Sequence, residues 1–129
     1  MNTTQTVQLS QEDESNAKIG EQNDAFRKSL GSDPRYAGKV VKTSNVASLS
    51  YAWQQHIMRE VVNFDSFDDD NDPYKTRDFG KFDVTFGIEL KTFYWKIDLY
   101  DINYEYGSNQ ADDPHKTRRV LTVLFPEDY

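Results

Sequence analysis

The amino-acid sequence predicts a single α+β domain, built mainly from an antiparallel sheet of about four to five strands with two helices packed on it. Apolar residues recur at helical spacing in the first half of the chain and alternate with polar residues in much of the second half. A length of 129 residues also suits one domain. We therefore expect a folded unit over residues 10–129 and a flexible N-terminus over residues 1–9.

The first helix is expected to begin after Ser10, because its hydroxyl can accept a free backbone N–H and acidic residues follow it. Ile19, Phe26 and Leu30 recur at spacings of seven and four, which places them on one helical face. Gly31 then suits the left-handed conformation that ends many helices. The predicted helix therefore fills the stretch between Ser10 and Gly31.

A strand and a second helix are expected next. Residues 38–43 are β-branched and bounded by turn residues, which indicates a short strand. The second helix is expected to begin near Ser48 or Ser50 and to end before Asn63. Apolar residues spaced by four form its buried face: Trp53, Ile57 and Val61.

The second half of the chain has the period of two that is typical of half-buried strands. Residues 82–86 and 93–100 predict a hairpin that turns within residues 87–90. Apolar and polar residues alternate again at residues 102–106, so a short third strand is expected there.

The last apolar run, residues 118–125, has two interpretations. A helix could start at Pro114, because Asp113 and Pro114 suit a cap and a first turn. We favour a strand that completes the sheet, because the run is rich in β-branched residues and ends at Pro126.

The composition excludes several classes of function. The chain has no Cys, which removes disulfides, thiolate metal sites and Cys nucleophiles. Its N-terminus is too polar for a signal peptide, and no apolar run approaches the roughly 20 residues that span a bilayer. The formal net charge of −7 argues against direct nucleic-acid binding. We therefore expect a cytoplasmic protein that contacts neither a membrane nor nucleic acid.

A long loop is predicted over residues 64–81, and its centre is the acidic run Asp68–Asp72. Acids at alternate positions invite comparison with the calcium loop of an EF-hand. Pro73 stands where that loop needs Gly, however, and Phe79 stands where it needs a bidentate Glu. We therefore predict no metal and no cofactor, and the plainest interpretation is a solvated acidic loop.

Negative charge gathers in two segments. Residues 98–113 hold five acids and no Lys or Arg, and residues 65–83 hold seven Asp against three cations. Such surfaces steer basic partners, and interleaved tyrosines can anchor them, although many acidic proteins use this charge for solubility alone. The nearby cations Lys116, Arg118 and Arg119 are expected to pair within the protein. The candidate partner-binding residues are Asp68, Asp69, Asp70, Asp72, Tyr74, Tyr100, Asp101, Tyr104, Glu105, Tyr106, Asp112 and Asp113.

Several short segments together resemble a known family. They are NDAFR (23–27), NDPY (71–74), DFG (78–80), WKID (95–98), YD (100–101), YGS (106–108), DP (113–114), TRRVLT (117–122) and EDY (127–129). In this order they resemble a small bacterial domain-of-unknown-function family that is often carried on plasmids and other mobile elements. The resemblance covers residues 20–129 and implies a compact α+β domain, but it implies no reaction and no catalytic residue.

The hypothesis that follows is a non-enzymatic acidic binding protein whose partner is the basic surface of a nucleic-acid-binding protein. Small acidic proteins of mobile elements include anti-restriction and anti-CRISPR inhibitors, so the resemblance implies, by analogy, a mimic of nucleic acid. The sequence lacks a nucleophile elbow, a phosphate-binding Gly-rich loop and a His pair at metal spacing. Two alternatives stay open. One is an accessory domain without a site; the other is a small divalent-metal phosphoesterase that uses Asp98, Asp101 and Asp78, with His115 nearby.

Overall fold

The computed structural model describes residues 10–129, so the expectation of a flexible segment at residues 1–9 lies outside the described residues. Within the described range, no helix is long and apolar enough to cross a membrane. The elements follow in the order α1 (Gln11–Lys28), β1 (Gly38–Lys42), α2 (Ser44–Ala47), α3 (Tyr51–Asn63), β2 (Phe79–Phe86), β3 (Glu89–Tyr100), β4 (Arg118–Leu124) and the short 3-10 helix η1 (Pro126–Asp128).

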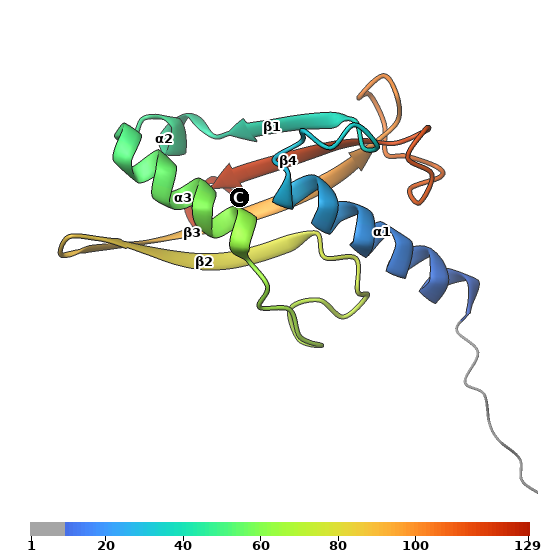
Figure 1. Ribbon diagram of the computed structural model, residues 1–129, viewed down its shortest axis with the longest axis horizontal. Coiled ribbons are helices and arrows are strands. Elements are labelled where there is room, and N and C mark those ends of the chain that lie inside the picture. The colour runs from blue at the N-terminus through green and yellow to red at the C-terminus, as the bar shows by residue number, and fades with distance from the viewer. Residues whose placement is uncertain (1–9) are drawn as a thin grey trace, which may run out of the picture.

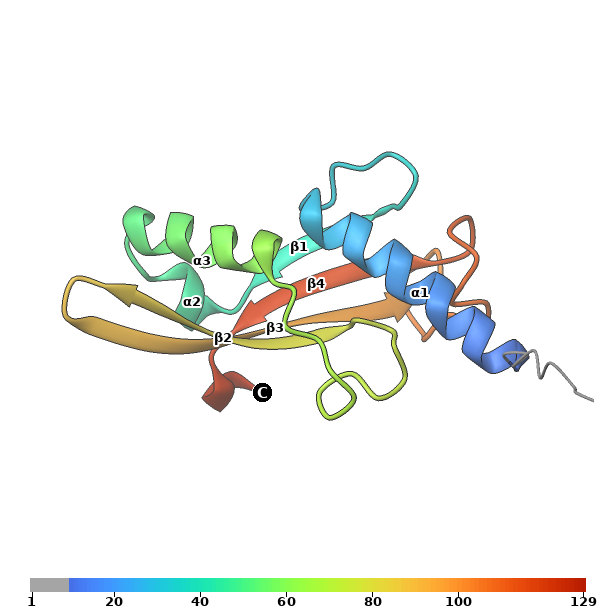
Figure 2. The same cartoon turned by 60° about the horizontal axis from the view of Figure 1, so that its bottom comes forward.

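The strands form one mixed sheet in the order β1-β4-β3-β2. β1 pairs with β4 in parallel, whereas β4 with β3 and β3 with β2 are antiparallel. The helices α1 and α3 lie over one face of this sheet (Figures 1 and 2). The predicted α+β class with a mainly antiparallel sheet is therefore confirmed.

The hydrophobic core lies between the sheet and the two long helices. Alternate residues of β3 and β4 point toward the helices and are buried, while most of their neighbours on the other face are partly exposed. Fully buried members of the core include Phe26, Val46, Ile57, Val61, Phe93, Trp95, Leu121 and Val123.

The predicted helix ends are confirmed almost to the residue. The Ser10 hydroxyl accepts a backbone N–H of the first turn of α1 at 3.0 Å, and Gly31 has a φ of 78°. The Ser50 hydroxyl caps α3 in the same way at 3.4 Å, and α3 extends through Asn63. The short helix α2 was not predicted. Its cap is Thr43, which directly follows β1, so the turn of helix continues the strand without a linker.

The predicted third strand at residues 102–106 is wrong, because turns occupy this stretch with one isolated bridge to the end of β3. The Asp101 carboxylate accepts two backbone N–H groups of the following residues, at 3.0 and 3.1 Å. Tyr104 has a φ of 57°, which an extended strand does not contain. These local hydrogen bonds curl the backbone, so the alternation of residue types there does not reflect a strand.

The observed ends of the hairpin strands and of the acidic loop differ by a few residues from the predicted ones. The hairpin turns at Gly87 and Ile88, and β2 begins at Phe79, so the acidic loop spans residues 64–78. The alternative helix at Pro114 is wrong, because the last apolar run forms β4 between β1 and β3. Successive residues of β4 alternate between partly exposed and buried from Arg118 to Val123, as the strand interpretation requires.

Candidate partner-binding surface

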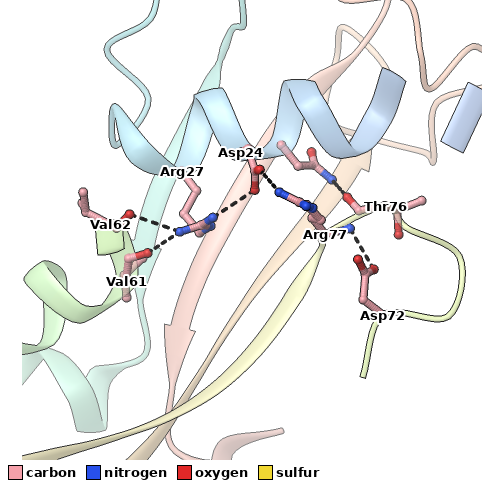
Figure 3. A network of polar contacts seen from close by, with 8 residues as sticks. Asp24, Arg27, Val61, Val62, Asp72, Thr76 and Arg77 are labelled. Atoms are coloured by element: carbon pink, nitrogen blue, oxygen red, sulfur yellow. Dashed lines mark hydrogen bonds and ion pairs between the residues drawn. The ribbon is translucent and has the colours of Figure 1, made fainter. Parts of the chain in front are cut away.

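A largely buried cluster of polar residues connects α1 to the rest of the domain. Polar groups are seldom buried without hydrogen-bond partners, and most members of this cluster have specific ones. We call it the polar hub; it consists of Gln22, Asn23, Asp24, Arg27, Arg77 and Arg119, and part of it is seen in Figure 3.

The Arg27 guanidinium lies at the C-terminal end of α3. Its Nη1 donates to the carbonyl oxygens of Val61 and Val62 at 2.7 and 3.3 Å, and its Nη2 pairs with Asp24 at 3.0 Å. The last carbonyls of a helix lack partners within it and form the negative end of its dipole, so this cation satisfies them. The guanidinium carbon also lies 4.9 Å from the centre of the Trp95 ring. Burial lowers the pKa of Arg27, while the Asp24 carboxylate opposes that shift.

Arg119 of β4 is fully buried beneath α1, and in the described residues it has no carboxylate partner. Its Nε donates to Asn23 Oδ1 at 2.8 Å, and its Nη2 donates to Gln22 Oε1 at 2.7 Å. Desolvation lowers the pKa of Arg119 to about 10, so the group stays charged at neutral pH. Arg119 is thus used internally, as expected, but its partners are amides rather than acids.

The polar hub holds the two acidic segments on either side of α1. Gln22 Nε2 donates to the carbonyl oxygen of Asp112 at 2.8 Å, and Asn23 Nδ2 donates to that of Thr76 at 2.8 Å. Two adjacent residues of one helix therefore fix both segments at the same end of the sheet (Figure 1). The two segments therefore lie on either side of one helix.

The helix between the two segments is itself acidic. The first acids of α1 were predicted only as partners of the helix dipole, and their place beside the loop was not predicted. Helical spacing does not place these consecutive acids on one face, and it gives no information on what lies next to them. The exposed acids of α1 are Glu12, Asp13, Glu14 and Glu21. We call these four residues, together with the acids of residues 64–78 and 98–113, the acidic end.

A groove of about 640 Å³ runs between α1 and the loop. Glu12 and Asp13 line one wall, and Tyr74, which is 68% exposed, lines the other together with Lys75, whose ammonium is paired with Asp69. The loop can approach the helix this closely because residue 20 is Gly; a Cβ there would collide with the carbonyl oxygen of Lys75. Two carboxylates beside an aromatic ring form the kind of site that a guanidinium or ammonium group binds.

The predicted binding residues of the loop differ in accessibility. Asp70 and Tyr74 are exposed, whereas Asp69 is paired with a lysine of the same loop at 2.5 Å. Asp68 is exposed, but its Oδ1 accepts two N–H groups of its own turn at 2.9 Å each. Asp72 is 5% exposed and accepts an N–H within the loop at 3.0 Å (Figure 3). Asp72 therefore shapes the loop instead of presenting its charge.

The predicted binding residues of the second segment, residues 98–113, also differ in how accessible they are. Glu105 and Tyr106 are exposed, Tyr106 by 72%. Tyr100 and Tyr104 are half-buried, and a lysine of β1 places its Nζ 4.2 Å from the centre of the Tyr104 ring. The Asp101 carboxylate accepts backbone N–H groups of its own turn. Glu105 and Tyr106 are therefore the predicted residues of this stretch that a partner could reach without rearrangement.

Asp112 and Asp113 complete the predicted set, and both are half-buried. The Asp113 carboxylate accepts the N–H of His115 at 2.9 Å, which organises the turn before β4. Asp112 is held against α1 through its backbone carbonyl, so its carboxylate adds to the charge beside the helix.

A family model provides the comparison with known proteins. The model described as "Protein of unknown function (DUF3768)" matches residues 42–128. The chain belongs to the DUF3768 family. Membership of a domain-of-unknown-function family, expected from the resemblance, is thereby confirmed. The matched part includes both acidic segments and ends in η1, while α1 precedes it. No curated protein and no solved structure matches the chain.

In this DUF3768 chain two of the three carboxylates of the phosphoesterase alternative have partners of their own, while the third, Asp78, is close enough to Asp98 for the two charges to repel each other. Asp98 pairs with Lys96 at 3.0 Å, Asp101 holds its own turn, and His115 is exposed. Over residues 10–129, no three His, Asp or Glu side chains are grouped so that they could hold a metal ion.

Asp78, just before β2, is expected to oppose folding when it is charged. Desolvation is the main cause that raises its pKa, and the carboxylates of Asp72 and Asp98 add to it. Because the residue as a whole is exposed, solvent screening keeps the effect small. A folded-state pKa above the unfolded value means that stability falls as pH rises from the usual Asp pKa through the folded one.

Asp78→Asn is therefore expected to raise the melting temperature slightly at neutral pH. The gain should disappear below the usual range of carboxyl pKa values, where both residues are uncharged. Thermal unfolding followed by circular dichroism at several pH values measures this difference. Asp70→Asn, in the exposed loop, is the matched control, and equal stabilisation by both variants would contradict the expectation.

Proposed function

We propose that this chain is a non-enzymatic binding protein whose acidic end engages a basic surface on a nucleic-acid-binding protein. The groove between α1 and the loop carries the proposal, because it sets Glu12 and Asp13 beside the exposed Tyr74. A Lys or Arg side chain of the partner fits this chemistry: its charge pairs with the carboxylates and its apolar part contacts the ring.

More specifically, we propose that the acidic end mimics nucleic acid. Acids on three neighbouring pieces of chain replace the phosphates that a basic channel would otherwise bind. Support comes from the net charge of −7, from the exposed acids of α1 and from the resemblance to proteins carried on mobile elements. The partner is then a defence nuclease of the restriction or CRISPR-effector type, inhibited in the cytoplasm without direct contact between this chain and nucleic acid.

The test uses purified nucleases of both types and a labelled DNA duplex. Cleavage is measured as the intact chain is titrated in, and binding to each nuclease is measured between about 50 and 200 mM salt. We expect the chain to inhibit at least one of the nucleases, and we expect its binding to weaken steeply with salt, because the contacts are charged and exposed. The double variant Glu12→Lys, Asp70→Lys is expected to bind about tenfold more weakly, which corresponds to about 1.4 kcal/mol.

The matched control is Glu60→Lys, Glu89→Lys, which changes the net charge equally at exposed residues outside the acidic end. Retained inhibition by this control, together with weakening by Tyr74→Ala, would assign binding to the groove. Equal losses in both double variants would contradict a localised surface. If the chain neither binds nor inhibits any of the nucleases tested, the proposal that it mimics nucleic acid is overturned.

A further inference from the structure

β2 is an edge strand whose outer side is open. It is eight residues long, contains no Pro and pairs continuously with β3 on its inner side only. Long edges of this kind can pair with another strand unless charge, Pro or a bulge prevents it. The other edge, β1, has five residues and exposes Lys39 and Lys42.

The register shows which backbone groups of β2 face outward. Asp78 is opposite Ile97, and the Asp78 carbonyl accepts the Ile97 N–H at 2.8 Å. Hydrogen-bonded and non-bonded pairs alternate along an antiparallel ladder, so even-numbered residues of β2 bond to β3. The N–H and C=O groups of Lys81, Asp83 and Thr85 therefore point away from the sheet, and over residues 10–129 they have no backbone partner elsewhere.

The charges on this open edge are self-complementary. Lys81 and Asp83 are two residues apart, both are exposed and both lie on the face of the sheet opposite the helices. In an antiparallel pair of two β2 strands centred on Phe82, each Lys81 stands opposite an Asp83 of the other copy. A shift by one pair in either direction places Lys81 opposite Lys81 or Asp83 opposite Asp83, which is destabilising.

We infer that two copies of this chain pair along β2 in that register, joining two four-stranded sheets into one. The pairing satisfies the outward groups of Lys81 and Asp83 reciprocally, because both belong to a hydrogen-bonded position of the new ladder. Within the described residues Lys81 forms no ion pair of its own, so its ammonium is available to the second copy.

The hairpin tip supports a contact on this side of the molecule. Ile88 and Leu90 are 104% and 61% exposed, whereas Phe86 lies on the helix side of the sheet and packs against Trp53 and His56. The two exposed side chains leave apolar surface at the tip that a contact on this side would remove from water. In the register centred on Phe82, residue 86 stands opposite residue 78, so each tip lies beside the segment that leads into the neighbouring β2.

Sedimentation equilibrium of the full chain over a range of concentrations tests this inference. The wild type is expected to shift from the monomer mass of 15.0 kDa to twice that mass as concentration rises. Lys81→Asp and Asp83→Lys each place like charges opposite one another, so each is expected to remain monomeric at concentrations where the wild type is a dimer. The double variant Lys81→Asp, Asp83→Lys restores complementarity and is expected to dimerise again.

The controls separate this edge from other surfaces and from loss of folding. Circular dichroism confirms that each variant is folded, and Lys39→Asp on β1 is expected to leave dimerisation unchanged. The inference is overturned by a wild type that stays monomeric, by single variants that dimerise like the wild type, or by a folded double variant that does not dimerise. The result is independent of the acidic end, because neither substituted residue belongs to the groove.

Discussion

Arg27→Met is expected to destabilise the domain by about 3–5 kcal/mol, because it breaks a buried ion pair and leaves the other partners behind. The substitution removes the donors to Val61 and Val62, so carbonyl oxygens at the end of α3 lose their partners. Asp24 keeps only its ion pair with the half-exposed Arg77. Since whole domains are stable by about 5–15 kcal/mol, this one change removes a large part of the total.

Urea unfolding followed by tryptophan fluorescence measures this loss, because Trp95 lies directly beside the guanidinium. Arg35→Met is the control: Arg35 also pairs with an aspartate, at 2.7 Å, but its side chain is 67% exposed. An exposed pair contributes at most about 1 kcal/mol. Similar losses in the two variants would show that burial of Arg27 adds nothing to the strength of the pair.

Gly38→Ala is expected to destabilise the domain by about 3 kcal/mol, although it adds only one methyl group. The new Cβ would collide with the carbonyl oxygen of Arg119, its partner on β4, and would lie 2.8 Å from the ring of Phe26. Neither neighbour can move freely, because the first belongs to the sheet backbone and the second is a fully buried side chain of α1. The added methyl must therefore separate β1 from β4 or lift α1 from the sheet.

Thermal and urea unfolding measure the effect of Gly38→Ala, and Gly107→Ala is the matched control. The nearest atom to a Cβ at Gly107 is a carbonyl oxygen at 4.0 Å, which is ordinary contact. This control is expected to change stability by less than about 1 kcal/mol. A loss of that size for Gly38→Ala as well would contradict the tight packing between β1, β4 and α1.

The sequence predicted those elements whose signals are local. Ser10, Ser50 and Gly31 mark helix ends through hydrogen bonds and backbone conformations that involve only a few neighbouring residues. The alternation in β2, β3 and β4 reflects one buried and one partly exposed face, which any half-buried strand needs. The same alternation at residues 102–106 does not come from a strand, because the side chain of Asp101 bonds the backbone there into a turn.

The candidate site was predicted in part. The two acidic segments were recognised from charge, but Asp72 proved to be buried, and Asp68, Asp69 and Asp101 have partners within their own loops. Charge counting cannot separate a carboxylate that faces solvent from one that closes a turn. It also could not place the acids of α1 beside the loop, because that depends on contacts between segments far apart in sequence.

By itself, the sequence determined the types of the elements, most of their boundaries and the acidic character of two segments, because these depend on neighbouring residues. Only the tertiary structure decided that both segments flank α1. Gln22 reaches Asp112 across 90 residues of sequence, and Asn23 reaches Thr76 across 53. The physical reason is burial: these amides can leave water only where the fold supplies hydrogen-bond partners, and those partners exist only once the sheet has assembled beneath the helix.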